Sequence, residues 1–388
     1  MPSSRPAVER IPHGVVFQEA NPFKDTYAGA EDIVFLELMQ IVPQDRGTAL
    51  DPKQVIVFSH PIGGGAYLPM VTALARAGHH VVYANTRFRG NDTALIMEKC
   101  AVDLGAAIRY CKERLGYERV VLGGWSGGGS LSLFYQAEAE QPTITATPAG
   151  DPVDLVAADL IPADGILLLA AHISRAGTLT EWIDASILDE AKPFERDPSL
   201  NLYDSENPDQ PPYDAAFLER YRTAQLARNR RITAWVQQRL EDLSDAPNGQ
   251  REHCFTTHGT MADPRWLDPT IDANQRKPGW CYLGDPRVVN DGPVGLARFS
   301  TLRSWMSQWS FDHSKADGIS CGARTSVPTL VIGNLADDAC TPSHTHRLFE
   351  SIQHQRKKLV EIDRATHYYF NQPEQLAEAV VACTEWLG

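Results

Sequence analysis

The sequence predicts an α/β protein in which a mostly parallel sheet is covered by helices on both faces. From residue 32 onward, short β-branched apolar runs alternate with longer stretches of helical period, an order typical of parallel strands linked by helices. Most of the short runs are apolar throughout, which indicates strands buried on both faces. The chain has 388 residues, 43% of them hydrophobic, and is therefore long enough to form a sizeable core.

Segments with the composition of buried strands occur in both halves of the chain. They are residues 32–42, 54–60, 80–86, 119–124, 165–171, 328–334 and 358–363. Apolar residues at helical spacing predict helices between and after these strands. The predicted helices are residues 69–77, 93–115, 128–138, 343–352 and 373–387.

One interval breaks this alternation. About 150 residues between 171 and 328 are rich in Pro, Asp, Arg and Trp and lack a strand of the buried type, and a compact domain does not tolerate so long a structureless loop. We therefore expect core segments at 1–171 and 328–388, with an inserted helical subdomain at 172–327. Within the insertion, apolar spacing predicts a long helix over 212–243. Its five arginines from Arg220 to Arg231 are expected to lie on a solvated face, with an anion site as the alternative.

The charge and cysteine content exclude several classes of protein. A net charge of −13 disfavours nucleic acid and anionic membranes as partners. No run has the apolar length of a signal peptide or a membrane helix, so we expect a cytoplasmic protein without membrane insertion. The seven cysteines form no CxxC pair, which indicates reduced thiols rather than a disulfide framework or a zinc knuckle.

Five glycines surround Ser126 in the stretch RVVLGGWSGGGSLSLFY, residues 119–135. Residues 124–128 fit G-x-S-x-G, the nucleophile elbow, in which a strained serine joins a strand to a helix. The flanking glycines are needed because the turn brings neighbouring backbone too close for a Cβ. Gly127 begins the predicted helix, so its amide N–H can face a developing oxyanion.

A second glycine-rich loop, His60-Pro61-Ile62-Gly63-Gly64-Gly65, follows the predicted strand 54–60. In a sheet with a nucleophile elbow, this position supplies the second oxyanion donor. The Ile62 N–H is the expected donor.

With these two motifs, the chain resembles the α/β-hydrolase family over roughly residues 30–171 and 325–388, and looks like a serine esterase- or lipase-like member. The resemblance implies that an acid and a base follow the serine in the order Ser, Asp, His. Asp337 and Asp338 follow the strand 328–334, and His367 lies after the last predicted strand. The insertion falls where many members carry a helical cap, which implies an enclosed pocket for a small ester-like substrate with apolar parts.

The predicted function is hydrolysis of a carboxylic ester through an acyl-enzyme on Ser126. A serine hydroxyl needs a neutral imidazole to accept its proton and a carboxylate to orient that imidazole. His367 is the expected base. Asp337, with Cys340 three residues further on, is the expected acid, and Asp338 is the alternative.

Other functions stay open at this stage. The same triad would serve cleavage of an amide, a lactone or a carbon–carbon bond, and a non-catalytic binding protein on this fold is a further alternative. No phosphate loop or dinucleotide fingerprint is present, so we predict no cofactor. The histidine pairs lack a convincing third ligand, so we predict no metal. Homo-oligomerisation is left open.

Overall fold

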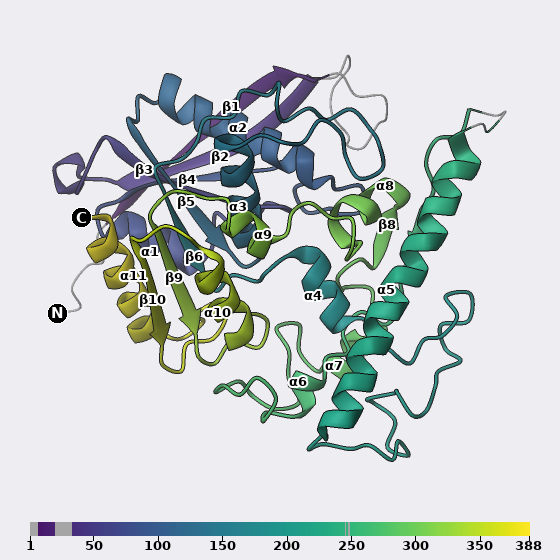
Figure 1. Cartoon of the computed structure of the whole chain (residues 1–388). Coiled ribbons are helices and arrows are strands. Elements are labelled where there is room, and N and C mark those ends of the chain that lie inside the picture. Colours follow the sequence, from purple (N-terminus) through teal and green to yellow (C-terminus); the bar gives the residue numbers. More distant parts are fainter. Residues whose placement is uncertain (1–6, 20–32, 245, 247–248) are drawn as a thin grey trace.

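The computed structural model describes residues 7–19, 33–244, 246 and 249–388. Its centre is an eight-stranded sheet with the order β1-β2-β4-β3-β5-β6-β9-β10 (Figure 1). The strands are β1 Val8–Gln18, β2 Ile33–Pro43, β3 Gln54–His60, β4 His80–Asn85, β5 Arg119–Trp125, β6 Gly165–Leu169, β9 Thr329–Asn334 and β10 Lys357–Ile362. β2 pairs antiparallel with both β1 and β4, and the other neighbouring strands are parallel.

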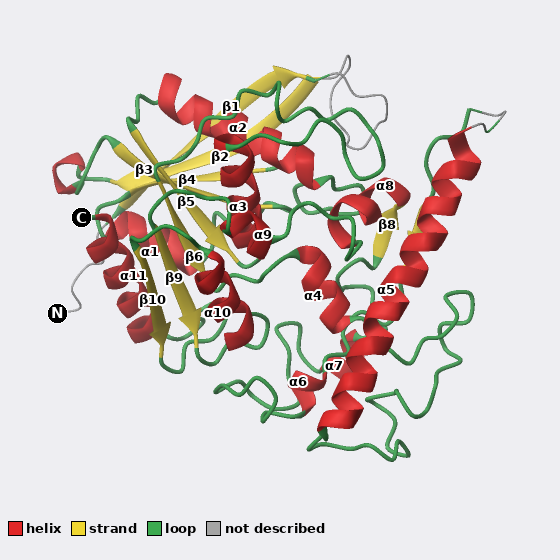
Figure 2. Ribbon diagram, in the orientation of Figure 1, coloured by secondary structure: helices red, strands yellow, loops and turns green. Residues whose placement is uncertain are grey.

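Helices cover both faces of this sheet (Figure 2). They are α1 Pro69–Arg76, α2 Met97–Glu113, α3 Gly127–Glu140, α10 Pro342–Ser351 and α11 Pro373–Leu387. Alternate residues of β3 point to opposite faces: Val55 and Val57 pack in the core beneath α2, α3 and α10, whereas Ile56 and Phe58 pack in the core beneath α1 and α11. The predicted fold class is therefore confirmed.

The predicted strands match the observed ones to within a few residues, except that residue 32 lies outside the described part of the chain. β1 was not predicted. It is the edge strand of the sheet, and its sequence VERIPHGVVFQ contains Pro12, Gly14 and several polar residues. Only one of its residues, Val15, is buried, so β1 lacks the continuous apolar run on which the other strands were recognised.

The insertion 172–327 joins β6 to β9, the sixth and seventh strands of the main sheet. Its helices are α4 Arg175–Trp182, α5 Ala215–Ser244, α6 Pro264–Leu267, α7 Pro286–Val289, α8 Leu302–Ser304, η2 Trp305–Trp309 and α9 Gly318–Gly322. It is less helical than the sequence predicts, because long loops separate these helices and β7 Cys254–Thr256 pairs with β8 Phe299–Thr301. Figure 1 shows α5 along the outer side of the insertion, away from the sheet.

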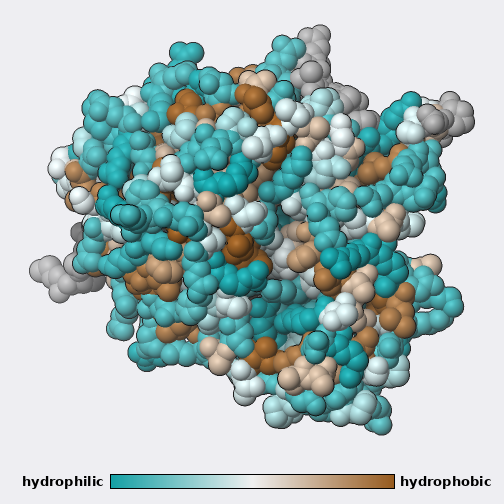
Figure 3. Space-filling model, viewed as in Figure 1, coloured by the Kyte–Doolittle hydropathy of each residue, from teal (hydrophilic) through white to brown (hydrophobic). Residues whose placement is uncertain are grey.

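The surface agrees with the composition of the chain. The face drawn in Figure 3 is mainly hydrophilic, with small scattered apolar patches. Within the described residues, no helix combines the length and the apolar character needed to cross a membrane.

Arg228 of α5 corrects the prediction that the arginines of this helix are solvated. Its side chain is 1% exposed. The guanidinium donates to the carbonyls of Asp184, His258 and Gly259 and pairs with both carboxylate oxygens of Glu190 at 2.9 and 2.7 Å. A single buried cation thus holds three carbonyls of the insertion in place.

We expect Arg228→Met to destabilise the protein by about 3 kcal/mol, because it removes the five hydrogen bonds of the buried guanidinium. Arg230→Met on the same helix is the control, since its pair with Asp312 is exposed to solvent and contributes little to stability. Urea unfolding followed by circular dichroism measures both. Equal losses in the two variants would contradict a structural role for the buried guanidinium.

Candidate active site

Ser126 lies at the turn between β5 and α3 with φ 51° and ψ −121°. A positive φ is unusual for a residue with a side chain and stores about 1–3 kcal/mol of strain. The turn is held by hydrogen bonds, because the Ser126 N–H donates toward the carbonyls of Leu169 and Ala170, and its own carbonyl accepts from the Gly129 N–H. The strained conformation is thus fixed by the adjacent strand β6 and by the first turn of α3.

The glycines around Ser126 allow the backbone segments to approach closely. A Cβ added to Gly128 would lie 2.2 Å from the Ser59 carbonyl oxygen, and one added to Gly124 would lie 2.6 Å from the Gly129 Cα. Real Cβ atoms do not come this close to backbone atoms. The elbow therefore requires glycine for steric reasons, as the sequence motif predicts.

His367 and Asp337 form a buried pair. The His367 Nδ1–H donates to Asp337 Oδ2 at 2.8 Å, and the two side chains are 4% and 0% exposed. The other carboxylate oxygen, Oδ1, accepts from the amides of Ala339 and Cys340 at 2.8 and 2.9 Å. Burial alone would lower the pKa of His367, but the charge and hydrogen bond of Asp337 outweigh it and raise the pKa above 6.5.

Asp338 lies in a different environment from its neighbour. Its backbone carbonyl accepts from the Trp266 indole at 2.7 Å, and no hydrogen bond joins its side chain to His367 in the part of the chain that the structure describes. Burial, followed by the charge of Asp337, raises the pKa of the Asp338 carboxyl to about 7. Of the two candidate acids, the structure pairs Asp337 with His367.

Burial raises the pKa of the Cys340 thiol well above its usual value, and the nearby Ser126 side chain acts in the opposite direction. No hydrogen bond between Ser126 and His367 is found among the described residues, and such contacts are often loose before a substrate binds. The side-chain atoms of Asp337, Cys340 and His367 that could bind a metal ion lie within 4.8 Å of one another. All three are residue types that bind zinc. Within this cluster, Asp337 and His367 already bond to each other.

The two backbone amides predicted to bind the oxyanion, those of Gly127 and Ile62, differ in their hydrogen-bond acceptors. Gly127 is the first residue of α3, so its N–H has no intrahelical acceptor. The Ile62 N–H, in contrast, donates to His60 Nδ1 at 3.3 Å. The next two amides of the loop are also engaged, since Gly63 donates to the His60 carbonyl and Gly64 to the Asn85 side chain.

A small cavity of about 120 Å³ opens beside the serine. Six of the residues that line it are Ser126, His60, Ile62, Tyr83, Trp125 and Tyr368. Aromatic side chains therefore form part of the walls. Ile62 and Ser126 border the same space, whereas His367 and Asp337 are not among the residues that line it.

Two histidines that the sequence analysis did not assign to the site border Gly127. A Cβ added to Gly127 would lie 2.9 Å from His60 Nε2 and 3.2 Å from His172 Nε2. Burial lowers the pKa of His60 to about 3, with further contributions from Arg175 and His367, and also lowers the pKa of His172 well below 6.5. The available signal was topological: both residues end or follow parallel strands, whose carboxyl ends meet at one edge.

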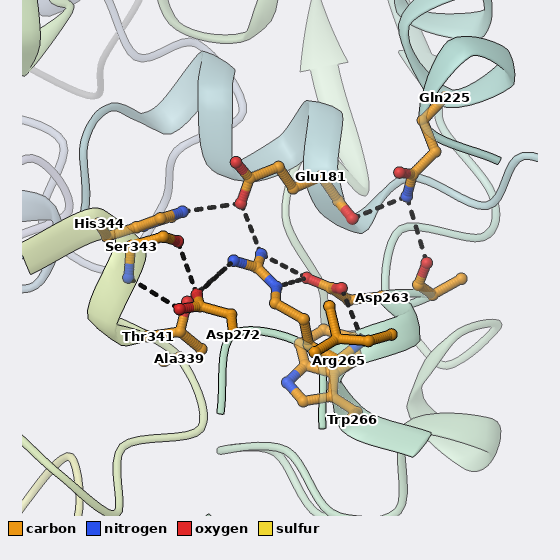
Figure 4. A network of polar contacts seen from close by, with 12 residues as sticks. Glu181, Gln225, Asp263, Arg265, Trp266, Asp272, Ala339, Thr341, Ser343 and His344 are labelled. Atoms are coloured by element: carbon orange, nitrogen blue, oxygen red, sulfur yellow. Dashed lines mark hydrogen bonds and ion pairs between the residues drawn. The ribbon is translucent and has the colours of Figure 1, made fainter. Parts of the chain in front are cut away.

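A polar network ties the insertion to the loop that carries Asp337 (Figure 4). Arg265 is buried and pairs with Asp263 and Glu181 at 2.5 Å each, and it donates to the Thr341 hydroxyl at 2.8 Å. Glu181 also bonds to His344 Nε2 at 2.7 Å. Burial would raise the pKa of Glu181, but Arg265 and His344 keep it well below its usual value.

Further bonds from the insertion reach the two aspartates themselves. Trp266 donates to the Asp338 carbonyl, and the Asn274 amide donates to the Asp337 carbonyl at 2.7 Å. The position of the acid loop therefore depends on residues 172–327 as well as on β9.

Comparison with solved structures supports the topology. The whole chain aligns with 95% of PA2218, a hypothetical protein from Pseudomonas aeruginosa, at 13% identity and a TM-score of 0.51. That likeness, the sheet order and the serine elbow after β5 decide the fold. The chain has the α/β-hydrolase fold.

Two further structures with lower TM-scores also align with this α/β-hydrolase chain. The alignment with Est1E from Butyrivibrio proteoclasticus includes 91% of this chain and 93% of Est1E, with 12% identity and a TM-score of 0.45. The monoacylglycerol lipase of Paleococcus ferrophilus covers 86% over 93% of its length, with 17% identity and a TM-score of 0.42. No protein-family model and no curated protein matches the sequence.

Proposed function

We propose that this protein is a serine hydrolase that cleaves carboxylic esters through an acyl-enzyme on Ser126. The observation that carries the proposal is the buried His367–Asp337 pair, with its 2.8 Å hydrogen bond, near a serine held at φ 51°. The pair leaves His367 Nε2 free to act as a base, because Nδ1–H is committed to Asp337.

The reaction follows from these positions. Ser126 Oγ attacks the ester carbon while His367 Nε2 accepts the serine proton, and the carbonyl π electrons move to oxygen. His367 then returns the proton to the leaving alcohol as the C–O bond breaks. Water attacks the acyl carbon while His367 accepts its proton, and His367 then returns this proton to Ser126 Oγ as the acyl–oxygen bond breaks and the acid leaves.

The oxyanion is stabilised by the Gly127 N–H and by a second donor from the loop 60–65. The dipole of α3 adds to the Gly127 contribution, because Gly127 is at the positive end of that helix. The Ile62 N–H is the sequence-based candidate for the second donor, but it would first have to leave its bond to His60 Nδ1.

We also propose that residues 172–327 act as a cap that shapes the substrate site. Trp182 and Trp266 of the insertion pack against Ala339 and Cys340 of the acid loop. The cavity of about 120 Å³ beside Ser126 suits a small acyl group, and its aromatic walls suit apolar parts of the substrate.

The first test combines hydrolysis assays with covalent labelling. Wild-type protein is expected to hydrolyse short-chain p-nitrophenyl esters, and a fluorophosphonate is expected to add to the peptide that contains Ser126. Ser126→Ala should lose both, because it lacks the nucleophile, whereas Ser132→Ala on the same helix should keep both. A parallel screen of amides and lactones reveals other acyl bonds, and labelling elsewhere in the chain would overturn the assignment.

The second prediction separates the two aspartates. Asp337→Asn should reduce kcat about 10⁴-fold, because an asparagine that donates to Nδ1 holds His367 in the wrong tautomer. Asp338→Asn should stay within about tenfold of wild type, since its carboxyl makes no bond to the base. Steady-state kinetics decide between them, and the reverse ranking would transfer the role to Asp338.

The third prediction concerns pH. Because only neutral imidazole accepts the serine proton and the pKa of His367 is raised, kcat/KM should fall as the pH drops through a value above 6.5. Asp338→Asn removes one of the charges that raise this pKa, so the acid limb should move to lower pH. Profiles from pH 5 to 9 measure the shift, and an unmoved limb would contradict the coupling.

A further inference from the structure

His60 ends β3 and faces the amide that begins α3. It lines the same cavity as Ser126, and a Cβ at residue 127 would lie only 2.9 Å from its Nε2 atom. The glycine at position 127 thus does more than permit a turn. It leaves space for the edge of an imidazole next to an expected oxyanion donor.

The hydrogen bond from Ile62 identifies the tautomer of His60. A backbone N–H only donates, so His60 Nδ1, which accepts from Ile62 at 3.3 Å, carries no proton. The pKa of His60 is lowered to about 3 by burial, so the ring is neutral in the range where enzymes are assayed. Its one N–H proton is therefore on Nε2, and within the described residues this N–H has no acceptor.

We propose that His60 is a catalytic residue whose Nε2–H donates a hydrogen bond to the oxyanion, in the place expected for the Ile62 amide. This inference rests on the proposed function of Ser126. When Ser126 Oγ bonds to the carbonyl carbon, the π electron pair moves to the carbonyl oxygen, which then accepts from Gly127 N–H and His60 Nε2–H. No proton leaves His60, and the Ile62 N–H holds the tautomer instead of contacting the substrate.

His172 is the competing candidate, because its Nε2 also borders Gly127. Its tautomer is not held in the same way. His172 Nδ1 is buried and has no hydrogen-bond partner in the described part of the chain, so nothing on the ring selects Nε2–H. His172→Met is therefore the matched control.

The test compares His60→Gln with His60→Met. The two side chains have the same length, but only glutamine carries an N–H at its end. With a short-chain p-nitrophenyl ester, His60→Met should lower kcat about 10²–10³-fold with little change in KM, as loss of one oxyanion donor does. The inhibition constant of a trifluoromethyl ketone should rise by a similar factor. His60→Gln should recover most of the loss, and the acid limb of the pH profile should not move.

Several outcomes would overturn the proposal. They are equal activity of the Gln and Met variants, parallel changes in KM and in the ketone inhibition constant, or a larger effect in His172→Met. A measurement on wild-type protein needs no variant: the His60 Nε2–H resonance of ¹⁵N-histidine-labelled protein should move downfield when the ketone binds, and an unmoved resonance also contradicts the proposal. Failure of fluorophosphonate to label Ser126 would instead remove the proposed function itself.

Discussion

The site depends on how closely the first turn of α3 approaches the ends of β3 and β6. Gly128 lies against the Ser59 carbonyl, and a Cβ on Gly129 would lie 2.4 Å from the Ala171 Cβ. These contacts leave no freedom for Ser126, whose strained φ is maintained by packing on both sides. The same approach brings His60, at the end of β3, beside Gly127.

A second constraint is the buried charge of Asp337, which bonds to His367 Nδ1. Asp337 has both carboxylate oxygens occupied by N–H donors, so its charge is buried but fully hydrogen-bonded. Asp338 receives no such set of donors, and an adjacent charge further disfavours its ionised form. Two neighbouring residues of one type therefore lie in different electrostatic environments, because the loop directs Asp337 toward two backbone N–H groups.

Much of this arrangement was predictable from the sequence, for physical reasons. Buried parallel strands are apolar on both faces, so β3 to β6 were recognisable, and the glycines of the elbow report a steric requirement that is local in the chain. β1 was not, since an edge strand needs few apolar residues. The burial of Arg228 also escaped prediction, because its partners lie about 30 to 45 residues away along the chain.

The histidines around Gly127 also make contacts that could not be predicted from the sequence. The positions of His60 and His367 after strands are readable from the sequence, but which nitrogen of each ring carries the proton depends on hydrogen bonds that only the folded chain reveals. Likewise, Asp337 and Asp338 could be ranked by spacing, whereas the amides of Ala339 and Cys340 that distinguish them belong to the shape of one turn.

The Arg265 network has a consequence for how small molecules reach the serine. A rigid-body movement of residues 172–327 away from the acid loop would break three hydrogen bonds. They join Glu181 to His344, Arg265 to Thr341 and Trp266 to Asp338. These bonds therefore hold the insertion in a fixed position against the acid loop. Tyr67 lines the cavity beside Ser126 and is 74% exposed, so the cavity meets solvent at this residue.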